Sequence, residues 1–269
     1  MVRKQRPVWQ RAVGVAAVAA AIAVGVWFAR QGEAPVVLPP APPADPVVEA
    51  ETGERHPIGQ AQVDAEPESP ETLPPLTESD AAVIEALQAL ADDGDPLWIP
   101  QYLVQRFVAT VDNLPRQKLA LPLRPVKPAP GTLRVREEAD GRVVLDPANA
   151  ERYARHLSVA EAVDSERAVA LYVRFYPLFQ QAYRELGYPG AHFNDRLVEV
   201  VDHLLAAPEI DAPLALVPEK GGWAFADPAL ESLSSGHKIL LRIGPDNARR
   251  AKAKLRELRT VLTGESLPR

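Results

Sequence analysis

The feature that most constrains this chain is an uncharged apolar run from Ala12 to Ala29, AVGVAAVAAAIAVGVWFA. A helix needs roughly 20 mainly apolar residues to cross a hydrocarbon core about 30 Å thick. The run is close to that length, and Trp27 near its end suits the interface between lipid and water. The sequence therefore predicts a transmembrane helix over residues 12–30 that contacts membrane lipid.

Charges on either side of this run predict its direction. It is preceded by Arg3, Lys4, Arg6 and Arg11, and the chain that follows it is acidic. Lys and Arg accumulate on the cytoplasmic side of membrane helices. We expect residues 1–11 to form a basic cytoplasmic tail, the helix to act as a signal anchor, and the remaining chain to lie on the far side of the membrane.

Two other interpretations of the run stay open. A cleaved secretory signal would also have a basic start, an apolar stretch and small residues, with cleavage near Ala21 or Ala23. The run continues beyond these residues to Trp27 and Phe28, which favours an uncleaved anchor. A buried core helix is the weaker alternative, because the chain that follows offers it nothing to pack against.

Residues 31–76 have the composition of a disordered linker. They contain eleven prolines, nine acidic residues and a single basic residue, Arg55. Such a segment buries too little apolar surface to offset the entropy that it would lose on ordering. Proline and like charge should keep it extended, at roughly 3.1 Å per residue.

Composition also excludes several classes of protein. The chain has no cysteine, which rules out disulfides, zinc-thiolate sites and thiol nucleophiles. Its net charge is -6, and it lacks the basic footprint of a nucleic-acid-binding protein. It contains no phosphate-binding glycine loop, no Gly-x-Ser-x-Gly and no His-Glu-x-x-His. We therefore expect no nucleic-acid partner and no cofactor.

Residues 77–263 predict a mainly α fold, a helix-rich single soluble domain with one or two small β-hairpins, followed by a short tail at 264–269. Helical spacing of apolar residues and helix start signals predict helices at about 79–90, 97–111, 147–157, 165–187, 193–206, 227–243 and 245–262, with a short helix between 157 and 162. Alternating residues predict hairpins at 132–145, with a two-residue turn at Asp140-Gly141, and at 214–225.

Single residues add detail to these helices. Ser79 and Asn194 precede or open helical segments and are candidate N-caps. Pro177 lies inside the segment 165–187, so we expect a kink or a break there. Seven of the twelve Phe and Tyr residues fall between 172 and 193, which predicts an aromatic core rather than a ligand site.

The segment 193–206 carries the candidates for a cation site. Steps of about 100° per residue place Asp195, Glu199 and Asp202 on one helix face, with His203 beside Glu199. Metal-binding bundles use paired Glu-x-x-His motifs that project inward, whereas this face is opposite the apolar one and has no second motif. The favoured interpretation is a solvated acidic face, and no metal site is predicted.

Two further patterns carry weak chemical hypotheses. Ser235 and Lys238 match the Ser-x-x-Lys nucleophile motif, but its companion motifs are missing, so the catalytic residues stay unknown and an enzyme is not favoured. The last helix is basic and could lie on anionic lipid headgroups, although its apolar stripe favours packing in the core. Its basic residues are Arg249, Arg250, Lys252, Lys254, Arg256 and Arg259.

Three long stretches carry a family resemblance: RFVATVDNLPRQKLALPLRPVKP, YPLFQQAYRELGYPGAHFNDRLVEVVDHLLAAPE and FADPALESLSSGHKILLRIGPDNARRAKAKLRELR. Over residues 77–262 the chain resembles a bacterial family known only as domain of unknown function 3014. The resemblance implies a proteobacterial envelope protein with an N-terminal anchor, and it carries over no catalytic residue.

These observations together lead to three functional hypotheses. The first is a periplasmic binding or adaptor domain, tethered to the bacterial inner membrane, with an envelope protein as partner. The second is a hydrolase of cell-wall or lipid material that uses Ser235 with Lys238 or the acidic residues near His203. The third is an envelope assembly or stress factor.

Overall fold

The computed structural model describes residues 53–90, 97–118 and 123–265. The predicted basic tail, the predicted transmembrane helix and the first part of the predicted linker all lie outside these ranges. Across the described ranges, no helix combines the length and the apolar character needed to cross a membrane.

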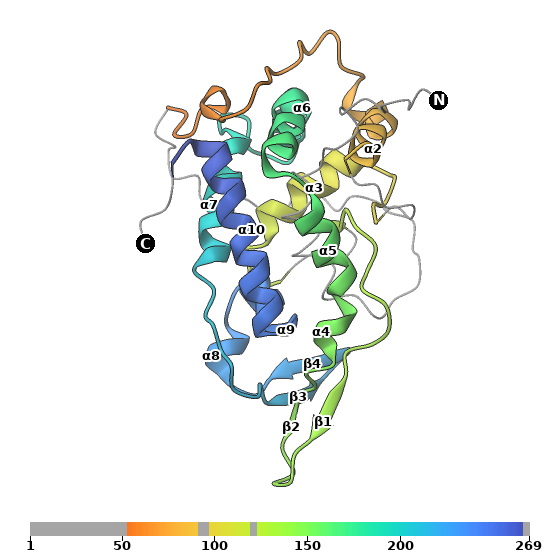
Figure 1. Ribbon diagram of the computed structural model, residues 1–269, viewed down its shortest axis with the longest axis vertical. Helices are drawn as coiled ribbons and strands as arrows, with labels where there is room; N and C mark the ends of the chain where they lie inside the picture. Colours follow the sequence, from red (N-terminus) through yellow and green to blue (C-terminus); the bar gives the residue numbers. More distant parts are fainter. Residues whose placement is uncertain (1–52, 91–96, 119–122, 266–269) are drawn as a thin grey trace, which may run out of the picture.

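Four helices surround the main core: α3 (Leu103–Asn113), α6 (Ser165–Glu185), α7 (Phe193–Leu205) and α10 (Pro245–Thr263). Figure 1 shows α6 crossing one end of the molecule while α7 and α10 run side by side along its length. Where α6 meets α3 and α7, Phe179 packs edge-to-face on Phe107 and is stacked with Phe193. The predicted aromatic core is therefore confirmed.

Shorter elements complete the mainly α fold, which agrees with the predicted class. The remaining helices are α2 (Asp80–Gln88), α4 (Asn149–Arg152), α5 (Ala154–Ala162), α8 (Pro228–Glu231) and α9 (Ser235–Arg242), with 3-10 turns η1 (Ile58–Gln60) and η2 (Leu76–Glu78).

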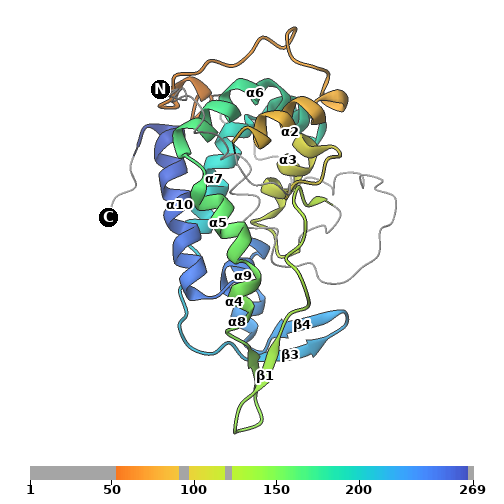
Figure 2. The same ribbon diagram turned by 45° about the vertical axis from the view of Figure 1, so that its right-hand side comes forward.

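Two antiparallel hairpins lie together at the end of the molecule opposite α6 (Figures 1 and 2). Strand β1 (Val135–Glu137) pairs with β2 (Val143–Leu145), and β3 (Leu216–Glu219) pairs with β4 (Gly222–Phe225). A bridge between Val144 and Ala215 joins the two hairpins. The first turn is longer than the predicted two residues, because Glu137 pairs with Val143 and Gly141 takes a φ of 81° within the loop.

Several predicted helix boundaries are wrong for tertiary reasons. Helix α3 begins at Leu103 and not near 97, because Trp98 forms a β-bridge with Val126 and Tyr102 has a φ of 54°. Of the kink or break expected at Pro177, the break does not occur, because α6 runs as one helix through this residue. The segment 227–243 is divided into α8 and α9.

The two predicted N-caps have different outcomes. Ser79 does occupy the N-cap position of α2, but its hydroxyl donates back to Leu76 O (2.9 Å) and makes no capping hydrogen bond. The N-cap residue of α7 is His192, and the Asn194 side chain instead donates to His56 O (2.8 Å). Both side chains therefore bond to chain outside the helix that they were expected to cap.

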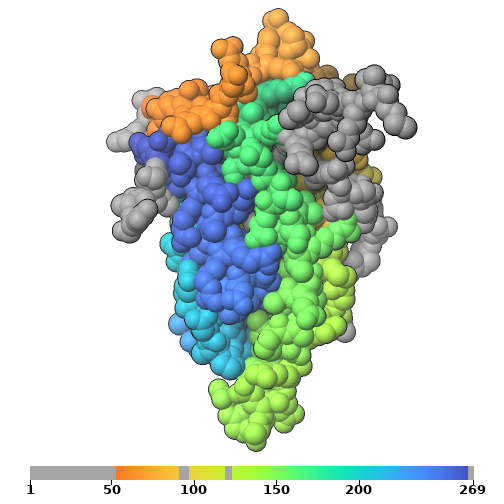
Figure 3. Space-filling view, viewed as in Figure 1, coloured from red at the N-terminus to blue at the C-terminus, as the bar shows by residue number. Residues whose placement is uncertain are grey.

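The folded part begins earlier than the predicted boundary at residue 77. Residues 53–72, which we call the strap, lie across the end of the molecule formed by α6, α7 and α10, and appear in orange at the top of Figure 3. Leu73 and Leu76, which follow the strap, are buried in the main core. The described half of the predicted disordered linker is thus packed on the helices. Composition alone does not reveal these contacts.

Candidate functional site

The most distinctive polar cluster lies where the C-terminal end of α3 meets α7 and the N-terminus of α9. The amides of Ser235 and Gly236 donate to Arg116 O (2.6 Å) and Leu114 O (2.9 Å). A Cβ at position 236 would lie 2.4 Å from Leu204 Cδ2 and 3.2 Å from Leu114 O. A larger residue would force Leu204 and the Leu114 carbonyl to move, so this close approach favours glycine, a role that the sequence pattern did not reveal.

Two stacked histidines and a serine occupy this junction. The rings of His203 and His237 are nearly parallel, with centroids 4.1 Å apart. His203 Nε2 lies 2.8 Å from Ser234 Oγ, and His237 Nε2 lies 2.6 Å from His203 O. Ser234 Oγ also accepts the His237 amide as the N-cap of α9 (3.2 Å), so the hydroxyl bonds to both histidine residues.

The electrostatic surroundings keep His203 neutral. Burial lowers its pKa below the ordinary value, and the neighbouring His237 and Arg196 lower it further, while Glu199 acts in the opposite direction. The hydrogen bond with Ser234 suits a neutral His203 in either tautomer, because a hydroxyl can donate or accept.

A hydrogen-bonded serine and histidine can form a nucleophile and its base. Acyl transfer also needs amide donors directed at the developing oxyanion. Here the nearest amides, those of Ser235, Gly236 and His237, donate to Arg116 O, Leu114 O and Ser234 Oγ. Ser234 is thus explained as a helix cap that also bonds to His203. These three amides are already engaged and are not directed at a substrate oxyanion.

The predicted pair of Ser235 and Lys238 is not brought together as a catalytic dyad. Lys238 Nζ donates to Glu231 Oε1 (2.7 Å) and to Glu231 O (3.0 Å). Ser235 contributes its backbone amide to the contact with α3. The lysine is therefore engaged with α8, where it holds α8 against α9.

The four cation-site candidates on α7 are bound to separate partners. Asp195 is buried and accepts the amides of strap residues, whereas Glu199 is half-exposed and pairs with Arg196 (3.0 Å). Asp202 pairs with Arg259 of α10, and His203 faces Ser234. Within the described ranges no group of three His, Asp or Glu side chains could hold a metal ion. The predicted solvated face is wrong at Asp195, because the strap covers it.

A buried carboxylate that the sequence did not single out ties α3 to α7. Asp112 accepts from Arg196 Nε (3.0 Å), Arg116 (2.9 Å) and the Tyr188 hydroxyl (3.3 Å). A charge inside a fold is tolerated when it is paired and hydrogen-bonded in this way. Asp112 lies at the end of a helical segment with apolar spacing, and its partners are 4 to 84 residues away in the sequence. The spacing of residues therefore does not predict this network.

The basic residues of α10 include buried lysines that bond to helix ends and exposed arginines that form surface ion pairs. Lys252 Nζ donates to Ala207 O (2.6 Å) at the end of α7, and Lys254 Nζ donates to Val163 O (2.6 Å) at the end of α5. Arg250 pairs with Glu161, and Arg249 pairs with Asp246. Cations at helix C-termini satisfy free carbonyls and complement the helix dipole. These contacts favour the core-packing interpretation over a lipid-binding face.

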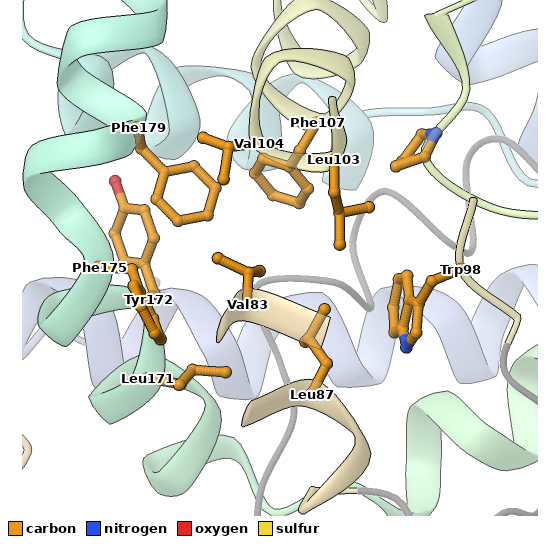
Figure 4. A pocket seen from close by; sticks show the side chains of 11 residues that line it. Val83, Leu87, Trp98, Leu103, Val104, Phe107, Leu171, Tyr172, Phe175 and Phe179 are labelled. Carbon is orange, nitrogen blue, oxygen red and sulfur yellow. The ribbon is translucent and has the colours of Figure 1, made fainter. Parts of the chain in front are cut away.

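An apolar cavity lies between α2, α3 and α6 (Figure 4). Its volume is about 30 Å³, and its walls include Val83, Trp98, Phe107 and Phe175. That space holds about one water-sized group, whereas apolar cavities that bind benzene are on the order of 150 Å³. In this conformation the cavity is a packing defect and not a ligand site.

Residues 103–259, more than half of the chain, match the family described as "Protein of unknown function (DUF3014)". The chain belongs to this family. The match covers α3 through most of α10, which includes the α3, α7 and α9 junction and the Asp112 network. Neither the curated proteins nor the solved structures contain a match.

Proposed function

We propose that this protein is a membrane-tethered binding or adaptor domain of the bacterial cell envelope, with its helical domain in the periplasm. The observation that carries the proposal is the uncharged run from Ala12 to Ala29 with basic residues before it and acidic chain after it. An anchor of this kind is typical of proteins that must stay near a membrane while their domain contacts something else.

The described side chains support binding more than catalysis. The serine and histidine pair at Ser234 and His203 has its neighbouring amides engaged, and Lys238 is paired with Glu231. Hairpins β1–β2 and β3–β4 lie at the end of the molecule opposite the strap (Figure 1). The strap leads back toward the anchor, so the hairpin end is the part of the domain that we expect to face a partner.

Reporter fusions test the location. Alkaline phosphatase fused after the last residue should be active. Green fluorescent protein fused at the same point and exported by the same route should be dark. Placing Arg at Val18 and Ala21 together should abolish phosphatase activity, because charge in the centre of the run prevents insertion. As a control, Arg at exposed Ala212 and Ala253 together should leave phosphatase activity unchanged. A phosphatase that is inactive in the unchanged chain would contradict the proposal.

A photocrosslinking amino acid tests the adaptor role. Placed at exposed Val217 in β3, it should give a discrete adduct with one envelope protein, while the same group in the strap at Glu66 should not. Adducts of equal yield and pattern at both positions would argue against a partner at the hairpin end. An adduct whose partner is a nascent or misfolded membrane protein would favour the assembly or stress factor instead.

The hydrogen bond between Ser234 Oγ and His203 Nε2 favours one second candidate, a hydrolase of cell-wall or lipid material. A fluorophosphonate probe should then label the chain, and Ser234→Ala should remove the label while Ser235→Ala keeps it. Absence of labelling under conditions that label a control serine hydrolase would remove this candidate.

A further inference from the structure

A polar clasp at the start of α7 holds the strap. The Asp195 carboxylate accepts the amides of Arg55 (3.1 Å) and His56 (2.6 Å), and Asn194 Nδ2 donates to His56 O (2.8 Å). No side chain between residues 53 and 72 is buried, although several are partly covered. Four partly buried apolar residues of the strap also pack against the main core: Ile58, Ala61, Val63 and Ala65. The hold therefore combines main-chain hydrogen bonds to two side chains with these partly buried apolar contacts.

Beyond this clasp the strap makes further polar contacts, which include an ion pair between Glu68 and Arg174 of α6. Gln62 N donates to Val261 O (2.8 Å), and Glu68 N donates to Arg174 O (3.0 Å). The ion pair between Arg55 and Glu199 spans 3.7 Å, with both side chains more than half exposed. Exposed pairs of this kind contribute little, because solvent screens them.

Two polar atoms of α6 and α7 are buried without partners. These are the Tyr172 hydroxyl and Asn194 Oδ1, neither of which has a hydrogen-bond partner. Asn194 is in direct contact with the strap, because its Nδ2 donates to His56 O. Burial raises the pKa of Tyr172 well above its usual range, and Tyr176, Glu54 and Asp195 raise it further. Burying an unpaired polar atom costs free energy that contact with water would recover.

We propose that the strap is a releasable latch that opens from α7 as a unit while the helices remain folded. Closure gains the clasp at Asp195, and opening restores hydration to Asn194. These opposing contributions place the open and closed states close in free energy, as in segments that open locally below the global unfolding free energy. The hinge is the proline-containing stretch before Leu73, which stays anchored in the core.

One consequence depends on the proposed membrane tether. With the latch closed, the tether between anchor and domain is the 23 residues from Gln31 to Gly53, which reach about 70 Å when extended at roughly 3.1 Å per residue. With the latch open, the tether continues to Thr72, and its reach grows to about 130 Å. The latch would thus set two distances at which the domain can work from the membrane.

Trypsin tests the latch on the full chain in detergent, because cleavage after Arg55 requires the clasp to open. We expect Asp195→Asn to increase the rate of cleavage at Arg55 about tenfold or more, with unchanged thermal unfolding of the helices. Gln62→Pro, which removes the amide donor to Val261 O, should give a smaller increase in the same direction. Glu199→Gln is the matched control on the same helix and should change the rate less than twofold.

Native-state hydrogen exchange gives an independent measurement. The amides of His56 and Gln62 should exchange at least a hundredfold faster than the core amides of α6. Exchange of these two amides at the α6 rate, or cleavage at Arg55 that occurs only together with cleavage inside the helices, would overturn the latch. Neither measurement depends on where the anchor inserts, so failure of the membrane proposal and failure of the latch are distinguishable.

Discussion

At the scale of single residues, the α9 N-terminus depends on the absence of a side chain at Gly236. Gly236→Ala places a methyl group against Leu204 and the carbonyl of Leu114, so we expect a loss of about 1–3 kcal/mol in the free energy of unfolding. Gly190→Ala is the control, because a Cβ there meets nothing within 4 Å. Urea denaturation measures the free energy of unfolding of both variants. Equal losses would show that contact with Leu204 and Leu114 does not determine the residue at position 236.

Two histidines predict how stability depends on pH. Burial lowers the pKa of His156, and it lowers the pKa of His203 together with His237 and Arg196. The unfolded chain therefore binds more protons near its ordinary His pKa of about 6.5, so stability is full above that pH and falls as pH decreases below it. Urea midpoints between pH 8 and 5 should show this decline, and His156→Gln should reduce its slope. A slope unchanged by the substitution would exclude His156 as a cause.

At the scale of elements, the lysines of α10 hold the ends of other helices. Lys254→Met keeps the apolar stem but removes the ammonium that donates to Val163 O at the end of α5. We expect a loss of about 1–3 kcal/mol, the usual value for a hydrogen bond to a charged group. Arg256→Met, on the exposed side of the same helix, should change stability by less than about 0.5 kcal/mol. A larger effect at Arg256 would contradict this assignment.

At the scale of elements, sequence predicts the long helices well but not their caps and starts. Apolar spacing gave α6, α7 and α10 within a few residues, because each helix buries one face along its length. The cap at Asn194 and the start of α3 were wrong, because contacts distant in sequence decide them. At the candidate junction, sequence pointed to Ser235 and His203, but Ser234, His237 and Gly236 become significant only when α9 approaches α3 and α7.

At the scale of the whole molecule, the strap shows why composition misjudged the boundary of the folded part. Proline and acidic residues predicted disorder up to residue 76, and such residues do leave the strap without a buried side chain. Its order comes instead from Asp195 and Asn194, about 140 positions later in the chain. A contact between main-chain amides and one distant carboxylate leaves no pattern in the strap sequence itself.

Fragments that begin at different residues separate the parts of this boundary. A fragment from residue 69 should be nearly as stable as one from residue 53, because the strap opens at low cost in free energy. A fragment from residue 77 should lose several kcal/mol, because it lacks Leu73 and Leu76, each of which contributes roughly 1.5–3 kcal/mol by burial in the core. Thermal and urea unfolding of the three fragments measure their order of stability. If stability instead falls mainly between the fragments from 53 and 69, the strap is an integral part of the fold and the described contacts at Asp195 hold it permanently closed.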